Sequence, residues 1–410
     1  MPSRAAMPFI LITVLIDMVS IGLIIPVLPP LVGTFTTNQA EQAFWFGAVS
    51  FAYGIANFFG SPILGALSDR YGRRPILLVG FSGLALSFFV TAMATALWML
   101  ILVRLFSGAM MANAAVANAY VADITLPAER ARRFGLLGAM FGLGFILGPV
   151  LGGLLGNIDL HLPFYVAGGM ALLNLAYGYF VLPESLVMER RTAFEWRKAN
   201  PVAALKGLAE LKGIGPLVIV LALSGLAQFV LHATWVLYTT FKFGWGPLAN
   251  GWSLFAVGVM SALVQGFLLK HLLRRFSAQR LAVMGLVSSS LCYLAWGLAP
   301  AGWMMFVVIG FNLLGFAVTA SMQSIVSNAA DESTQGRTLG AVSSLNSLMA
   351  VVAPVIGASL LGFVSHLPKG DWRIGAPYYF CAVLQAAAML IALRHFARER
   401  AMKSLQPAQT

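Results

Sequence analysis

Long apolar stretches alternate with short polar segments along the whole chain. A helix needs roughly 20 mostly apolar residues to cross the hydrocarbon core of a bilayer. Twelve stretches have this length, and their approximate bounds are 7–32, 43–67, 75–95, 97–122, 134–156, 164–182, 215–241, 248–271, 280–299, 302–327, 338–362 and 376–396. The pattern therefore predicts an all-α integral membrane protein with twelve transmembrane helices.

The longest polar stretch, Pro183 to Gly213, divides these helices into six and six. It predicts an N-terminal six-helix bundle at 1–183, a cytoplasmic linker at 184–213, and a C-terminal bundle with a tail at 214–410. The two halves also repeat one another at a constant spacing, in the pairs Trp98/Trp303, Arg132/Arg337, Gly135/Gly340, Pro149/Pro354 and Gly152/Gly357. Two parallel six-helix repeats predict a cavity between the halves that opens to either side of the membrane by rocking.

Composition agrees with the membrane assignment, since the chain is 59% hydrophobic and 10% charged. In a soluble protein a net charge of +12 would suggest a nucleic-acid partner. With the N-terminus inside, however, the external segments carry only Lys242, Lys369 and Arg373 among the 26 Lys and Arg. The positive-inside rule then places both termini in the cytoplasm. We expect membrane lipid and no nucleic acid as a partner.

Several other classes of protein are disfavoured. The first apolar run is too long for a cleavable signal peptide. Cys292 and Cys381 both fall inside predicted helices, which argues against a disulfide framework. No metal-spaced cluster, nucleotide-binding loop or hydrolase triad stands out, so we expect no metal site, no cofactor and no enzymatic activity.

The loop between the second and third predicted helices carries a spaced motif. It reads Gly65-Ala-Leu-Ser-Asp69-Arg70-Tyr-Gly72-Arg73-Arg74. Gly65 would allow a neighbouring helix to approach closely, and Gly72 would allow a tight turn. The arginines can pair with acidic side chains and with lipid phosphates. Asp123, at the end of the fourth predicted helix, is expected at the same depth as Asp69 and Arg73.

The fifth predicted helix is rich in small residues around one proline. Small residues at four-residue spacing make a smooth face for close helix packing, and a proline removes a backbone hydrogen bond and bends the helix. The residues of this motif are Gly144, Gly148, Pro149, Gly152 and Gly153.

These motifs resemble the twelve-helix drug/proton antiporters of the major facilitator superfamily, and in particular the tetracycline efflux proteins of Gram-negative bacteria. Further likeness lies at Ile16-Asp17, Ile21 to Pro29, Ala119 to Thr125, Glu129 to Arg132 and Leu182 to Ser185. The resemblance implies that Gly65, Asp69, Arg70, Gly72, Arg73 and Asp123 form a conformational gate. It also identifies the glycine–proline run as the antiporter motif, which is typical of exporters.

The chain departs from that family at three positions in its membrane helices. The family has an acid in helix 3, a histidine in helix 8 and an acid in helix 9. The aligned residues here are Ser87, Ser261 and Ser289. The apparatus for coupling and substrate binding is therefore simpler in this chain.

Asp17 alone among the 14 Asp and Glu falls well inside a predicted span. Removal from water disfavours the charged form of an acid, so Asp17 is a candidate for proton coupling, and its alternative is a hydrogen-bonded strut between helices. Arg104, in a family-like R-x-x-x-G run to Gly108, is a second candidate; its alternatives are packing and snorkelling to the outer surface.

Polar and aromatic residues inside the predicted spans are candidates for lining a substrate cavity, although hydrogen bonds between helices use the same residue types. The candidates are Asn57, Asn113, Gln228, His232, Trp235, Gln265, Asn312 and Gln323.

The sequence thus favours a monomeric transporter in the bacterial inner membrane. We expect it to export a small amphipathic drug-like molecule, with a tetracycline-like compound as one candidate, driven by the proton gradient. Two alternatives are a proton-coupled uptake symporter for a nutrient, against which the antiporter motif argues, and a non-transporting membrane sensor, against which the loop motif argues.

Overall fold

The computed structural model describes residues 6–111, 113–126, 129–196, 200–201, 215–329 and 335–405, and these residues form helices joined by turns. They pack as two compact units. The first unit consists of Met1–Pro201 with Thr239–Gly258, and the second of Val202–Tyr238 with Val259–Thr410. Two helices, α10 and α11, contribute residues to both units.

The helices of the sequence up to the polar stretch are α1 (Ala6–Ile24), α2 (Leu28–Gly33), α3 (Gln39–Tyr71), α4 (Arg73–Ala92), α5 (Leu97–Met110), α6 (Asn113–Ile124), α7 (Arg130–Ile158), α8 (Leu162–Phe180) and the 3-10 turn η2 (Met188–Arg190). Those that follow are α10 (Gly215–Phe243), α11 (Pro247–Leu263), the π-helical turn η3 (Val264–Leu268), α12 (Leu269–Arg275), α13 (Ala278–Leu298), α14 (Trp303–Phe311), η4 (Gly315–Ala317), α15 (Val318–Ala329), α16 (Gln335–Val364), η5 (Trp372–Gly375) and α17 (Ala376–Leu405).

The number of spans agrees closely with the sequence pattern. Ten helices in the described residues are long and apolar enough to cross a membrane, and counting one bent pair as a span gives eleven. The remaining predicted span corresponds to α8, a helix of 19 residues that is not among these. Asn174 is fully buried and its amide donates to the carbonyl of Thr13 in α1 at 3.0 Å. The all-α membrane fold expected from the sequence is confirmed.

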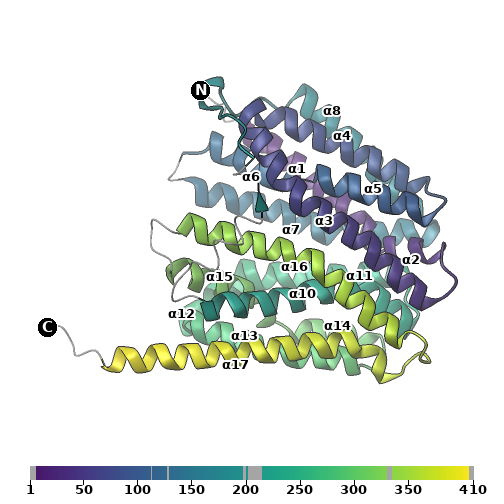
Figure 1. The fold of residues 1–410 in the computed structure, drawn as a ribbon, viewed down its shortest axis with the longest axis vertical. Helices are drawn as coiled ribbons and strands as arrows, with labels where there is room; N and C mark the ends of the chain where they lie inside the picture. The colour runs from purple at the N-terminus through teal and green to yellow at the C-terminus, as the bar shows by residue number, and fades with distance from the viewer. Residues whose placement is uncertain are drawn as a thin grey trace. The chain divides into compact units, whose positions relative to one another are not determined.

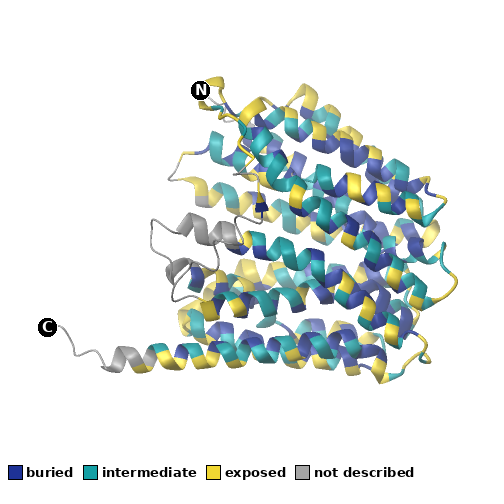
Figure 2. Ribbon diagram, in the orientation of Figure 1, coloured by how far each residue is buried: buried dark blue, intermediate teal, exposed yellow. Residues whose placement is uncertain are grey.

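Helices within each unit pack along their lengths (Figure 1). In the first unit α1 lies against α7 and α8, α3 against α5, and α4 against α8; in the second, α13 lies against α15 and α17. Exposed positions recur along the helices (Figure 2), and many carry large apolar side chains such as Phe180, Phe311 and Phe363. In a membrane these side chains face hydrocarbon, where their exposure costs nothing.

Two of the predicted helices are broken, which the sequence pattern did not indicate. At the fourth, α5 ends at Met110, Met111 has non-helical backbone (φ −86°, ψ 76°), and α6 begins at Asn113. At the tenth, the segments Trp303–Phe311 and Gly315–Val326 are bent by 55°. Asn113 and Val318, which begin α6 and α15, are related by the same spacing as Trp98 and Trp303. The helices after the two breaks thus begin at equivalent repeat positions, although the second bend, between Phe311 and Gly315, lies a few residues before the position equivalent to Met111.

Asn57 in α3 satisfies a carbonyl that the first break leaves free. Its Nδ2 donates to the carbonyl oxygen of Met111 at 3.2 Å. A backbone carbonyl without a partner is costly in a membrane because no water replaces the missing donor.

Replacing Asn57 with Leu should therefore lower stability by about 1–3 kcal/mol. The measurement is thermal unfolding of the purified protein in detergent. Asn118→Leu is the matched control, since Asn118 is exposed and its amide donates to the carbonyl of Ala114 in its own helix. Equal melting temperatures for the two variants would contradict the role assigned to Asn57.

Candidate functional site

A cluster of charged side chains joins the ends of α3, α4 and α6 in the first unit. Arg73 pairs with Asp69 (Nη1–Oδ1 2.6 Å) and with Asp123 (Nε–Oδ2 3.0 Å), and it donates to the Ser68 hydroxyl at 2.6 Å. The structure thus brings together three of the six residues predicted as a gate. The side chain of Asp123 is 21% exposed and that of Asp69 is 47% exposed, so Asp123 is the better shielded partner of Arg73.

Glu184 belongs to the same cluster although sequence reasoning gave it no role. Its carboxylate accepts the backbone N–H of Arg73 at 2.8 Å and of Arg74 at 3.2 Å, the first two residues of α4. A negative charge at a helix N-terminus is favourable because the free N–H groups and the helix dipole are positive there. The neighbouring Ser185 donates to Asp123 at 3.2 Å. The segment after α8 is thereby tied to α4 and α6.

The other predicted gate residues differ from one another in their conformation and surroundings. Gly72 has φ 108°, a conformation that favours glycine, and a Cβ there would collide with the Glu184 carboxylate. Arg70 is exposed and lies 5.1 Å from the ring of Tyr71, outside the cluster. A Cβ added at Gly65 would meet no described atom within 4 Å, so the close approach expected there is absent from this structure.

Asp17 lies in the interior of the first unit. It is 4% exposed, and Oδ1 accepts a hydrogen bond from Asn113 Nδ2 at 3.1 Å. The other end of the Asn113 amide lies against Gly80 of α4, where a Cβ would overlap its oxygen. The described residues place no Lys or Arg in an ion pair with Asp17. Asn113, predicted as a cavity residue, thus serves as the partner of the buried acid.

Arg104, the second residue predicted for proton coupling, does not pair with Asp17. It is 8% exposed, and its Nε and Nη2 have no hydrogen-bond partner in the described part of the chain. It lines a cavity of about 150 Å³ together with Tyr53, Ser87 and Ser107. Its side chain is therefore enclosed by protein.

The glycines of the antiporter motif make α7 fit between two helices of the first unit. A Cβ added at Gly144, Gly148 or Gly152 would overlap α1, and the one at Gly148 would lie 2.6 Å from the Cα of Gly22. A Cβ at Gly153 would lie 2.6 Å from the carbonyl oxygen of Pro247 in α11. Pro149 lies inside α7. The motif thus makes two backbone-to-backbone seams, with α1 on one face and α11 on the other.

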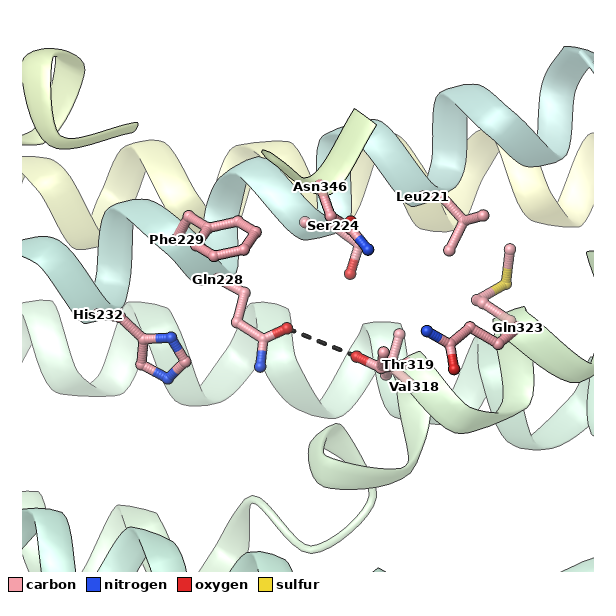
Figure 3. Close-up of a pocket in the computed structure, with 11 residues that line it drawn as sticks. Leu221, Ser224, Gln228, Phe229, His232, Val318, Thr319, Gln323 and Asn346 are labelled. Atoms are coloured by element: carbon pink, nitrogen blue, oxygen red, sulfur yellow. Dashed lines mark hydrogen bonds between the residues drawn. The ribbon is translucent and has the colours of Figure 1, made fainter. Parts of the chain in front are cut away.

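A second cavity, of about 200 Å³, lies in the second unit (Figure 3). Three predicted cavity residues, Gln228, His232 and Gln323, line it. Asn346 and Thr319 line it as well, and the Thr319 hydroxyl donates to Gln228 Oε1 at 3.5 Å. Polar side chains that project into one cavity from α10, α15 and α16 are suited to hold a polar part of a small molecule.

The other predicted cavity residues lie elsewhere. Trp235 packs edge-on against Trp296, with ring centroids 5.2 Å apart, in a buried aromatic cluster. Gln265 is exposed in the π-helical turn and donates to Ser261 at 2.6 Å. Asn312 is buried beside the second break and faces Gly315. Asn57 supports the first break, as described above.

Comparison with known proteins gives a consistent picture. A family model described as Major Facilitator Superfamily matches residues 10–354 and 217–410. The tetracycline resistance protein, class C, of Escherichia coli is 35% identical over 92% of this chain and 96% of its own length. The class D protein of Salmonella ordonez is 33% identical over 93% and 95%. The crystal structure of the nucleoside transporter NupG has a TM-score of 0.77 at 14% identity, covering 95% of this chain and 99% of that one, which shows a shared fold.

The unequal burial of the two acids around Arg73 generates a prediction. Asp123→Asn should lower stability by about 1–3 kcal/mol, because it removes a shielded charge-assisted hydrogen bond. Asp69→Asn should cost less than about 1 kcal/mol, because the side chain of Asp69 is itself about half exposed to solvent. Thermal unfolding in detergent measures both. Glu129→Gln is the control, since its pair with Arg133 is exposed; a larger loss for Asp69→Asn than for Asp123→Asn would contradict the ranking.

Proposed function

The chain belongs to the major facilitator superfamily and is a multi-pass membrane transporter, not an enzyme, and on this basis we propose that it exports a small amphipathic molecule in exchange for protons. The family expected from the sequence is confirmed. The curated relatives at 30–35% identity include tetracycline resistance proteins of classes B, C and D.

The observation that carries the proposal is the buried pair of Asp17 and Asn113. A carboxylate at membrane depth costs several kcal/mol to keep charged unless it is paired or hydrated. Its hydrogen-bond partner among the described residues is the neutral amide of Asn113. Gain and loss of a proton by Asp17 are therefore linked to how much water reaches it, and water access changes in a protein that opens alternately to the two sides of a membrane.

The direction of transport is proposed from the antiporter motif. Its glycines bring the backbone of α7 directly against α1 and α11, so that no side chain of the motif separates these helices. The seam with α1 ends near Met18, next to Asp17 in the chain. A shift of α7 along α1 would thus change the surroundings of the acid. A nutrient symporter is the rival, and an inward flux of substrate with protons would favour it.

The remaining assignments follow from the same proposal. We place the protein in the bacterial inner membrane with both termini in the cytoplasm, because of the distribution of Lys and Arg. We take it to act as a monomer with the proton gradient as its energy source and no cofactor. Gln228, His232 and Gln323 are proposed to contact substrate in the cavity of the second unit.

Asp17→Asn should abolish proton-driven transport while the protein remains folded, since Asn has the shape of Asp and can still accept from Asn113. Inverted membrane vesicles with an imposed pH gradient provide the test, and tetracycline and a panel of amphipathic drugs are the probes. Asp159→Asn, an exposed acid that accepts from the N–H of His161 and of Leu162, is the control. Undiminished gradient-driven export by Asp17→Asn would exclude the proposed coupling.

Gly148→Leu should reduce the transport rate at least ten-fold while membrane abundance falls much less, because the new side chain must separate α7 from Gly22 of α1. The rate in vesicles is normalised to the amount of protein. Gly142→Leu is the matched control in the same helix, because a Cβ at Gly142 meets no described atom within 4 Å. Similar rates for the two variants would show that the seam is not needed for turnover.

A further inference from the structure

The wall of the cavity around Arg104 has a polar part and an apolar part. Arg104 and Ser107 of α5, Tyr53 of α3 and Ser87 of α4 supply its polar groups. The rest of its wall consists of apolar side chains of α1 and α4, among them Phe88. Its volume of about 150 Å³ is roughly five times the share of one liquid water molecule, about 30 Å³.

Arg104 brings into this cavity a positive charge that the described residues do not neutralise. An arginine guanidinium is positively charged near neutral pH. Its Nε and Nη2 are enclosed and have no hydrogen-bond partner among the described residues, and no described Asp or Glu forms an ion pair with it. A charge in this position at membrane depth is costly, so residues of this kind are normally paired or serve a bound group.

Ser87 gives Arg104 no counter-charge. The structure places Ser87 on the wall of the Arg104 cavity. A serine hydroxyl supplies no negative charge, and this one donates to the carbonyl of Leu84 at 2.8 Å. The polar group that α4 brings to the cavity therefore leaves the charge of the arginine unbalanced.

We propose that the cavity binds the anionic group of an organic anion, with Arg104 as its charge partner. A carboxylate or sulfonate suits the planar guanidinium, which can donate two parallel hydrogen bonds. The apolar wall suits the hydrocarbon part of the same molecule, and the volume exceeds what a single inorganic ion requires. The inference rests on the proposed function, because it assigns the substrate class of that transporter.

Binding can be measured without transport, by thermal unfolding of the purified protein in detergent. The probes are two pairs that differ in charge but not in ring system: 2-naphthoate with 2-naphthamide, and salicylate with salicylamide. Chloride and sulfate at the same concentration test for an inorganic ion. We expect at least one carboxylate to raise the melting temperature by roughly 2–4 °C, and its amide partner and the inorganic ions to leave it unchanged.

Variants separate a binding role of Arg104 from a structural one. Arg104→Gln should lose the shift, yet melt no lower than the wild type without ligand, because an unpaired buried charge has been removed. Ser87→Asp should also lose the shift, since it supplies an internal partner. Arg373→Gln is the control, because Arg373 pairs with Asp371 in the second unit, and it should keep the shift.

Four results would overturn the proposal: no shift with either carboxylate, equal shifts with the amides or the inorganic ions, a shift retained in Arg104→Gln, or a lower ligand-free melting temperature for that variant. The test is independent of proton coupling, since Asp17→Asn should keep the shift. A wild-type protein that shows the shift but no gradient-driven export therefore counts against the proposed function alone. Export that persists while carboxylates fail to bind counts against the anion site alone.

Discussion

The absence of water around the helices is the constraint on which this structure depends. In hydrocarbon, a polar group that leaves its helix must be satisfied by another part of the protein. The side-chain amides of three asparagines donate these hydrogen bonds: Asn174 to the carbonyl of Thr13, Asn57 to that of Met111, and Asn113 to the carboxylate of Asp17. Each of these amides joins two helices of the first unit, so the same bonds that satisfy polar groups also fix helix positions. Arg104 differs in being charged: its guanidinium is buried, its Nε and Nη2 have no hydrogen-bond partner among the described residues, and this is what points to a ligand.

Two kinds of contact in the first unit differ in how strongly they resist movement. The cluster around Arg73 is built from charges and directional hydrogen bonds, which lose most of their energy when separated by a few ångströms. Along α7, glycines bring the backbone close to α1 and α11. Such packing contacts require no particular hydrogen-bond partner. A molecule that combines both can hold discrete states at one end of its helices while permitting sliding along their length. The buried acid lies beside such a seam, in α1.

Much of this architecture could be predicted from the sequence, because hydrophobic length and repeat spacing report directly on membrane spans. The grouping of Asp69, Arg73 and Asp123 was also accessible, since all three lie at predicted helix ends. The breaks in the fourth and tenth helices were not, because no proline marks them. Glu184 was missed because its role depends on a tertiary contact with the start of α4, far away in sequence. Trp235 and Gln265 do not line the cavity of the second unit, and residue type alone cannot tell which face of an apolar helix turns inward.

The two helix breaks show how little a break demands of the residue that follows it. α6 begins with Asn113 and α15 with Val318, at equivalent positions of the repeat, although the second bend lies a few residues before the position equivalent to Met111. The helix after a break can thus begin with an amide or with a hydrocarbon side chain. In the first half this position supplies the partner of the buried acid, whereas in the second half the polar groups of the cavity come from other positions. A change at this one position can therefore alter the chemistry of a half without removing its bend.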